Sequence, residues 1–315
     1  MTLNMVGEKM KNKVKLKRYN KKDVVQCYIL LALPLIGLFV LQLYPMLWAM
    51  TKAFCFYDGI DANTKWTGLE NFKQILSDKT YWNSWLVTFK FALYKLPVEI
   101  PLALAVATLL NAKIKCKGFF RAIFYMPSMI SVVIIGLIFS NLFSVFGFIN
   151  AWLAKWAMIE SGFNWFGSEH SAMIVLVVGS IWNTFGVNVI YFVAAFANVP
   201  AELYESAEID GASGAVKFFK ITLPMIAPVL QTILLLSING TLQTNEYIIA
   251  LTGGAPGGKT YTVMSYLVTK FAPGFADSVV NIGYGCALSI ITAIFMGAIA
   301  IIYTKLSDKF ADSAY

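Results

Sequence analysis

Residues 204–224 read YESAEIDGASGAVKFFKITLP, a polar stretch between two long apolar segments. Pro200 stands just upstream, where proline is tolerated at a helix start, and residues 201–209 are good helix formers with acidic side chains near the N-terminus. Gly211 interrupts this run and permits a sharp turn. The pattern predicts a short helix over 201–209, a turn, and a second short helix that enters an apolar span near Pro224.

The composition excludes an average soluble domain. Hydrophobic residues make up 58% and charged residues 13% of the 315 residues, whereas soluble domains carry about 25% charged residues. The net charge of +8 comes largely from a basic N-terminal tail, which is a topology and anionic-lipid signal rather than a nucleic-acid surface. We expect an all-α polytopic membrane protein with six transmembrane helices, at about residues 24–50, 82–111, 122–146, 171–196, 223–244 and 279–303.

The basic residues predict the orientation of these spans. With the N-terminus inside, 16 of the 25 Lys and Arg residues lie in cytoplasmic segments and seven lie in external loops, as the positive-inside rule requires. Both termini and residues 204–224 are then cytoplasmic, and residues 61, 161 and 257 are external. This placement follows from composition and charge alone.

The polar stretch resembles the EAA signature of the permease subunits of binding-protein-dependent ATP-binding-cassette (ABC) importers. That signature is Glu-Ala-Ala, three residues, Gly, nine residues and Ile-x-Leu-Pro. It is matched without a gap, with serine at one alanine position, by Glu205, Ser206, Ala207, Gly211, Ile221, Leu223 and Pro224. The surrounding sequence is similar to the carbohydrate (maltose and multiple-sugar) branch, over roughly residues 85–305.

The resemblance implies a type I ABC importer permease fold in a bacterial cytoplasmic membrane. It implies a cytoplasmic tail at 1–22, a first helix with an external loop at 23–80, a permease core at 81–305 with its coupling loop at 200–224, and a cytoplasmic tail at 306–315. The chain itself would be non-catalytic and need no cofactor. Its partners would be a second permease, two ATPase subunits, an extracellular solute-binding protein and a sugar or oligosaccharide.

The resemblance also implies two sets of functional residues. The ATPase-coupling set is Glu205, Ser206, Ala207, Asp210, Gly211, Ile221, Leu223 and Pro224. Gap-free alignment on the signature carries the substrate-binding positions of the family's maltose permease onto Asn183, Thr184, Val187, Ser237, Gly240, Thr241 and Thr244. Valine and glycine at two of these positions count against maltose itself. Alternatively, the polar side chains hold helices together.

Charged residues inside the second predicted span leave two interpretations open. Lys95 and Glu99 are four residues apart, so they share one face of a helix and can pair. Charges within a span are costly and usually face a bundle interior. The pair either belongs to a substrate pathway or is structural, and the role of Lys90 is open as well.

Other functions find less support in the residues. The run GGAPGGKT at 253–260 satisfies the phosphate-binding-loop pattern, but it lies in a short loop between two spans, with no α/β domain around it. Four scattered cysteines and a single histidine, His170, form no metal-ligand motif. The alternative functions are a permease for another solute, such as glycerol phosphate, and a secondary transporter, for which no internal repeat is evident.

Overall fold

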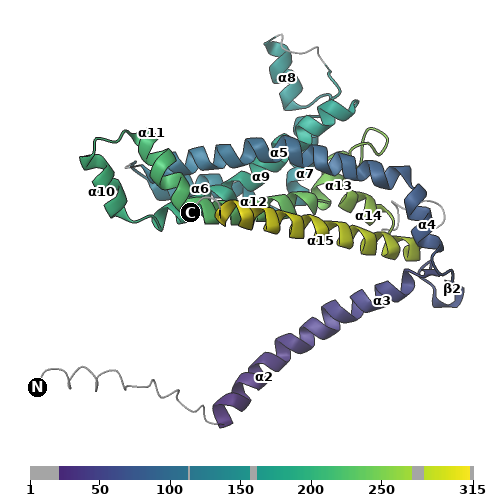
Figure 1. The fold of residues 1–315 in the computed structure, drawn as a ribbon. Coiled ribbons are helices and arrows are strands. Elements are labelled where there is room, and N and C mark those ends of the chain that lie inside the picture. Colours follow the sequence, from purple (N-terminus) through teal and green to yellow (C-terminus); the bar gives the residue numbers. More distant parts are fainter. Residues whose placement is uncertain (1–20, 113, 157–161, 272–279, 313–315) are drawn as a thin grey trace, which may run out of the picture. The chain divides into compact units, whose positions relative to one another are not determined.

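The computed structural model describes residues 21–112, 114–156, 162–271 and 280–312, most of which are helical (Figure 1). Two compact units are distinguished, residues 1–52 and 53–315. The basic tail expected at 1–22 lies almost entirely outside the described residues, as does the external position 161. In the first unit, α2 (Lys21–Leu38), η1 (Phe39–Leu43) and α3 (Tyr44–Lys52) follow one another as an apolar helical run. Its part from Val24 to Lys52 is long and apolar enough to cross a membrane.

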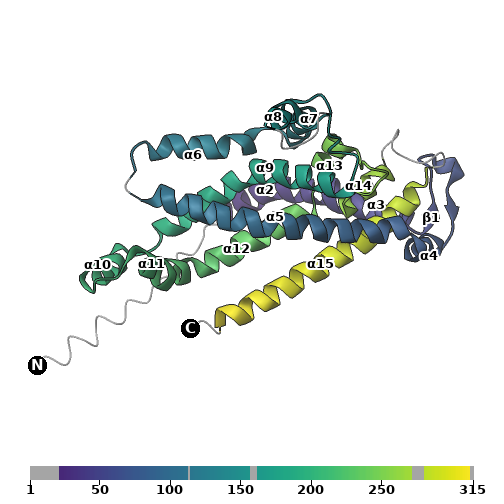
Figure 2. The same cartoon turned by 90° about the horizontal axis from the view of Figure 1, so that it is seen from above.

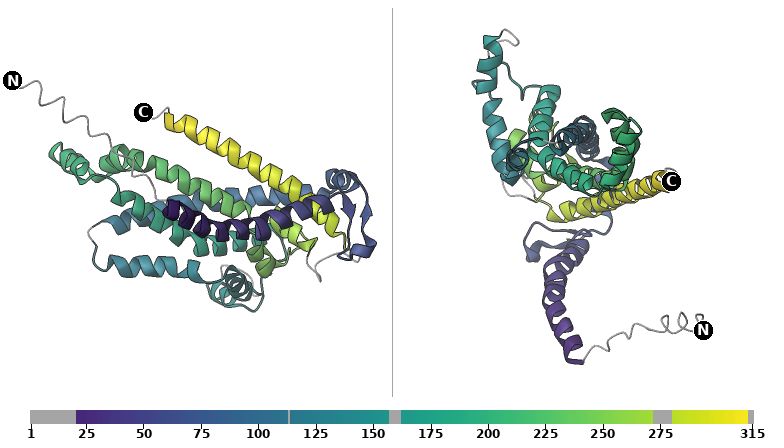
Figure 3. Two further views of the ribbon diagram at one scale, coloured as in Figure 1. Left: turned by 90° about the horizontal axis from the view of Figure 1, so that it is seen from below. Right: turned by 90° about the vertical axis from the view of Figure 1, so that its left-hand side faces the viewer.

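Four long helices form the body of the second unit and lie side by side (Figures 2 and 3). They are α5 (Lys79–Asn111), α9 (Glu169–Ala197), α12 (Leu223–Leu242) and α15 (Ile282–Asp312). Each covers one predicted span, and many of their large apolar side chains are exposed, which suits a lipid environment. Within the described residues, five helices can cross a membrane, or six with the bent pair below. This agrees with the all-α, six-span prediction.

The third predicted span, 122–146, is broken rather than continuous. α6 (Lys117–Tyr125) and the 3-10 turn η3 (Met126–Met129) are followed by α7 (Val132–Leu142), with a bend of 91° between the two parts. Pro127 lies in η3, and Ile130 and Ser131 have ψ values of 139° and 134°, far from helical. Two extended residues therefore separate the helices, and α7 turns to pack on a short helix far along the chain.

The predicted loops contain several short elements that apolar periodicity does not reveal. β1 (Cys55–Phe56) pairs antiparallel with β2 (Lys65–Trp66), flanking the 3-10 turn η2 (Asp61–Asn63), and Gly59 has the positive φ of a turn. The remaining elements are the helices α4 (Glu70–Ser77), α8 (Phe148–Lys155), α13 (Glu246–Thr252) and α14 (Val263–Thr269). The last predicted helix also continues past the expected boundary at residue 305.

The GGAPGGKT run lacks the surroundings of a phosphate-binding loop. It follows the helix α13 rather than a strand, and α14 begins only at Val263. The Thr260 hydroxyl, which would bind Mg²⁺ in such a loop, is fully buried and donates to the carbonyl of Ala255 at 2.8 Å. The run is a closed turn, as its place between two spans suggested.

The connection between α9 and α12 follows the sequence prediction closely. α10 (Ala201–Ile209) has the predicted bounds, and a turn leads to α11 (Gly214–Lys217) and the π-helical turn η4 (Phe218–Thr222). These elements lie at one end of the second unit, whereas β1, β2 and α4 lie at the opposite end (Figures 1 and 2).

Asp78 joins three helices at the end that carries α4. Its Oδ1 accepts hydrogen bonds from the backbone of Thr80 and Tyr81 at 3.0 Å each and so caps α5. Its Oδ2 accepts from the hydroxyls of Tyr266 in α14, at 2.7 Å, and Tyr284 in α15, at 2.6 Å. Partial burial raises the pKa of Asp78, but the hydrogen bonds from Tyr284, Tyr266 and the Tyr81 backbone, together with the charge of Lys270, outweigh burial and hold this pKa below the usual 3.8.

Asp78→Ala should therefore lower the free energy of unfolding by about 2–4 kcal/mol, because it removes the cap and two charge-assisted hydrogen bonds. The group with the lowered pKa stabilises the fold above pH 3.8, and its contribution is lost as the pH falls through the lowered value. Thermal unfolding in detergent should show Asp78→Ala to be less stable than wild type at pH 7. The difference in stability between the two proteins should shrink as the pH is lowered into the acid range. Asp58→Ala, in an exposed turn, is the control. Equal melting of Asp78→Ala and wild type would contradict this role.

Candidate functional site

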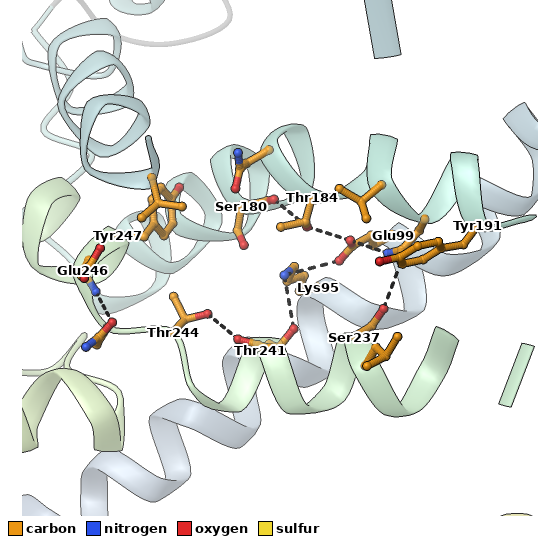
Figure 4. Close-up of a pocket in the computed structure, with 17 residues that line it drawn as sticks. Lys95, Glu99, Ser180, Thr184, Tyr191, Ser237, Thr241, Thr244, Glu246 and Tyr247 are labelled. Atoms are coloured by element: carbon orange, nitrogen blue, oxygen red, sulfur yellow. Dashed lines mark hydrogen bonds and ion pairs between the residues drawn. The ribbon is translucent and has the colours of Figure 1, made fainter. Parts of the chain in front are cut away.

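A cavity of about 430 Å³ lies between α5, α9 and α12, close to the start of α13 (Figure 4). All seven residues of the predicted substrate set line it: Asn183, Thr184, Val187, Ser237, Gly240, Thr241 and Thr244. It is also lined by Lys95, Glu99, Val132, Ser180, Asn188, Tyr191, Leu236, Asn245, Glu246 and Tyr247. The structure thus brings the predicted set together, and its binding role stays a prediction.

Helical spacing explains why α9 and α12 present so many polar groups to one space. On α9 the lining residues are 180, 183, 184, 187, 188 and 191, and on α12 they are 236, 237, 240 and 241, with 244 just beyond its end. Residues three or four apart share a helix face. Each helix therefore turns one mostly polar face toward the cavity.

α5 contributes the charged part of the wall. Lys95 Nζ lies 3.5 Å from Glu99 Oε2, and both side chains are almost completely buried, with 5% and 1% of their surface exposed. Lys95 Nζ also donates to Thr241 Oγ1 of α12 at 3.2 Å. The pairing expected from the four-residue spacing is confirmed, and the pair faces the cavity. Lys90, by contrast, pairs with Glu169 at 2.9 Å on an exposed surface.

Glu99 extends this network to α9. Its Oε1 accepts hydrogen bonds from Thr184 Oγ1 at 2.7 Å and from Asn188 Nδ2 at 2.8 Å. The Asn188 side-chain oxygen in turn accepts from Ser237 Oγ of α12 at 3.3 Å. Because a buried charge is costly unless it is paired and hydrogen-bonded, these contacts stabilise the pair and tie three helices together.

Asn183 and Gly186 hold the broken span against α9. Asn183 Nδ2 donates to the carbonyl oxygen of Pro127 at 3.0 Å, directly at the break. A Cβ at Gly186 would collide with the carbonyl oxygen of Phe124, so only glycine allows α6 to lie this close. In contrast, a Cβ at Gly240 would meet nothing within 4 Å, because that position opens into the cavity.

Sequence reasoning missed part of this wall. The sequence alone does not predict Ser180, Val132, Leu236 or Tyr247 in the wall, and it leaves the pathway role of Lys95 and Glu99 open. Extending the three- and four-residue spacing of α9 back from Asn183 would have found Ser180. Val132 and Tyr247 carry no such signal, because the break before α7 and the return of α13 place them there.

The predicted coupling residues lie together at the α10–α11 end of the unit and away from the cavity (Figure 1). Glu205, Ser206 and Ala207 are on α10, and Asp210 is its C-terminal capping residue. Ile221 belongs to η4, and Leu223 and Pro224 begin α12. The segment therefore connects directly to a helix that lines the cavity.

Gly211 makes the turn that ends α10. Its φ is +73°, a left-handed conformation that favours glycine, and its N–H donates to the carbonyl of Glu208 at 3.1 Å. The next N–H, of Ala212, donates to the carbonyl of Ala207 at 2.9 Å. A Cβ at Gly211 would meet nothing within 4 Å. A side chain there is therefore strained by the backbone rather than by a clash within this chain.

Two contacts brace the segment, while its outer face is open. Tyr204 and Thr222 share a hydrogen bond of 2.8 Å between their hydroxyls, and Lys217 Nζ lies 3.5 Å from Glu208 Oε2. Glu205 is exposed and makes no side-chain hydrogen bond or ion pair with the residues that the structure describes. Ile209 is 88% exposed although it is apolar. The outer face of the segment thus carries one exposed acidic and one exposed apolar side chain.

No group of three or more His, Cys, Asp or Glu side chains within the described residues could hold a metal ion. The chemistry that the cavity offers is therefore hydrogen bonding from hydroxyl, amide, ammonium and carboxylate groups.

Residues 99–311 match the family of binding-protein-dependent transport system inner membrane components. The chain belongs to this family and is an ABC importer permease. The match begins at Glu99 in the cavity wall and includes α9, the α10–α11 segment, α12 and nearly all of α15.

Several of the relatives found by sequence are named as permeases of sugar transport systems, and one is named as an sn-glycerol-3-phosphate permease. The arabinooligosaccharides transport permease AraP of Bacillus subtilis is 31% identical over 297 residues, covering 93% of this chain and 91% of that protein. The trehalose/maltose transport permease MalF of Thermococcus litoralis is 32% identical over 240 residues, covering 76% and 79% respectively. The multiple sugar-binding transport permease MsmF of Streptococcus mutans is 30% identical over 285 residues, covering 89% and 94%.

Solved structures confirm the fold. A chain of a bacterial ABC transporter that imports the acidic polysaccharide alginate superposes with a TM-score of 0.78 at 21% identity, covering 91% of this chain and 98% of that chain. A chain of a bacterial alginate ABC transporter, in complex with a periplasmic protein bound to alginate pentasaccharide, gives a TM-score of 0.75 at 24% identity, covering 92% and 97%. The fold is therefore that of type I importer permeases.

Proposed function

We propose that this chain is a permease subunit of an ATP-driven importer of a sugar or oligosaccharide. The observation that carries the proposal is the cavity, where hydroxyl, amide and charged groups converge between membrane-spanning helices. Such groups are costly in an apolar medium and mark solute pathways. Relatives covering most of the chain are named as permeases for arabinooligosaccharides and for trehalose and maltose, which supports a carbohydrate substrate.

The residues that line the cavity suit the chemistry of sugar recognition. A saccharide presents many hydroxyls and needs donors and acceptors, together with apolar or aromatic surfaces for its ring faces. Asn183, Thr184, Ser237, Thr241 and Thr244 supply the polar groups. Val187 supplies an apolar surface, Gly240 leaves open space, and Tyr191 supplies an aromatic ring.

The partners follow from what a permease of this family needs. The substrate path would be shared with a second permease, and an extracellular solute-binding protein would deliver the sugar. Two separate ATPase subunits would supply the energy, since GGAPGGKT is the only phosphate-loop pattern noted in the sequence and its surroundings rule against nucleotide binding. Purified alone, this chain should not hydrolyse ATP.

The basic residues support one orientation in a bacterial cytoplasmic membrane. Lys115 and Lys117 stand just before and at the start of α6, Lys217 and Lys220 are on α11 and η4, and Lys305 is near the end of α15. These segments lie at the α10–α11 end of the second unit (Figure 2). By the positive-inside rule this end and both termini face the cytoplasm. The α10–α11 segment is then within reach of a cytoplasmic ATPase.

Coupling would pass through α10. Glu205 would form a charge-assisted contact with a basic residue of the ATPase, and Gly211 would allow α10 to leave the docking cleft at a sharp angle. The Tyr204–Thr222 hydrogen bond links α10 to η4, which continues into α12. When the ATPase closes on ATP and reopens, a gripped α10 would move α9 and α12 and so open the cavity to each side in turn.

A bulky residue at position 240 tests the cavity as the substrate path. Gly240→Phe should abolish sugar uptake by the reconstituted complex, because a Cβ at this position meets nothing within 4 Å and the ring would occupy cavity space. Gly297→Phe is the matched control, since a Cβ there also meets nothing within 4 Å, but the position lies outside the cavity. Co-purification of all subunits establishes assembly. Normal uptake by an assembled Gly240→Phe complex would show that the path lies elsewhere.

Charge reversal at Glu205 tests the coupling contact. Glu205→Lys should release the ATPase subunits or abolish sugar-stimulated ATP hydrolysis, because loss of one charged partner at a buried interface costs about 2–5 kcal/mol. Gly211→Ala should weaken sugar-stimulated ATP hydrolysis, because alanine is strained in the left-handed backbone conformation that Gly211 adopts. The controls are Glu202→Lys on the same helix and Gly214→Ala, which has open space and no positive φ. Wild-type stimulation of ATP hydrolysis and wild-type subunit stoichiometry in Glu205→Lys would refute the coupling role of Glu205.

A cysteine introduced at Ser213 should react with a membrane-impermeant thiol reagent only from the cytoplasmic side.

A further inference from the structure

The charged pair of α5 offers more than structural support to the cavity wall. Three N–H groups are available on the Lys95 ammonium, and Thr241 accepts one of them at 3.2 Å. Glu99 Oε2 lies at 3.5 Å, in ion-pair contact but without a hydrogen bond from any described residue. In Figure 4 the ammonium stands between α9 and α12, beside Thr241 and Glu99. The pair therefore retains hydrogen-bonding capacity inside a buried, polar cavity.

The charged side chains that line the cavity leave it with an excess of negative charge. Among the described lining residues, Lys95 is the single cation, and Glu99 and Glu246 are the two anions. Lys95 is compensated by the carboxylate beside it, so no positive charge is left over for an anionic solute. A carboxylate or phosphate entering this space would meet a net negative wall. The free-energy cost of removing its water would then not be offset by an ion pair with the protein.

We propose, on the basis of the proposed sugar-import function, that Lys95 binds a substrate hydroxyl and that Glu99 cancels its charge, so that the cavity selects neutral saccharides over acidic ones. Lys95 donates to a sugar oxygen that replaces water in the cavity. Glu99 is a positioning residue, whose Oε1 is fixed by Thr184 and Asn188 while its Oε2 faces the ammonium. The selected class is an uncharged oligosaccharide rather than a uronate or a sugar phosphate.

A structural ion pair would look similar in the resting protein, so the test needs a readout of charge selection. Radiolabelled maltotriose and arabinotriose serve as neutral probes, and trigalacturonate and sn-glycerol 3-phosphate serve as acidic probes. Equilibrium binding is measured on the purified complex of both permeases and the ATPases, without the solute-binding protein, whose own specificity would mask the cavity. Wild type should bind at least one neutral trisaccharide at least ~10-fold more tightly than either acidic probe.

Two variants separate binding from structure. Glu99→Gln leaves the Lys95 charge unopposed, and it should shift the ratio of acidic to neutral binding at least ~10-fold toward the acidic probes. The double variant Lys95→Met/Glu99→Gln is uncharged and close in volume, and it should weaken neutral binding at least ~10-fold without a gain for acidic probes. Lys90→Met is the control, because it removes an exposed lysine of the same helix that does not line the cavity.

Each outcome decides between the two roles. Neutral binding by the assembled double variant within about twofold of wild type would make the pair structural and overturn this inference alone. An unchanged ratio in Glu99→Gln, or wild-type binding of trigalacturonate as tight as that of the neutral probes, would do the same. Failure of wild type to bind any neutral trisaccharide would overturn this inference together with the proposed function.

Discussion

The cost of burying an ion pair in an apolar helix bundle organises the centre of this molecule. Lys95 and Glu99 lie on a span whose other side chains are mostly apolar, and a buried charge without partners would be strongly destabilising. The pair is therefore surrounded by hydroxyl and amide groups from α9 and α12. Those groups hold three helices in one register, and they also create the polar wall of the cavity.

Two glycines show how the same residue type serves opposite needs in this fold. Gly186 permits close contact, because a side chain there would collide with α6 of the broken span. Gly240 lacks any neighbour where a Cβ would stand and so leaves room in the cavity. Gly186 lets α6 of the broken span pack closely against α9. Gly240 keeps the neighbouring cavity open. Replacing either would change the cavity, but for different physical reasons.

Local signals predicted the long helices and the coupling segment well. Apolar runs located α5, α9, α12 and α15, and Pro200 and Gly211 placed the bounds of α10. The 91° break, α13 and α14 could not be predicted from the sequence, because contacts between distant segments set their geometry. One such contact is the close approach of Gly136 on α7 to Ala250 on α13. Seven cavity positions followed from the family resemblance alone. The mutual pairing of Lys95 and Glu99 was predictable, but their further partners Thr241, Thr184 and Asn188 were not, since they come from two other helices.

The central claim is that events at the α10–α11 segment open the cavity to alternate sides of the membrane. The direct measurement uses a single cysteine at Ser237, in the cavity wall, with Cys27, Cys55, Cys116 and Cys286 replaced. The complete complex is labelled in vesicles with a membrane-impermeant thiol reagent, added from either side, in its nucleotide-free and ATP-trapped states. The side from which this cysteine reacts should switch between the two states. Labelling from the same side in both states would contradict it.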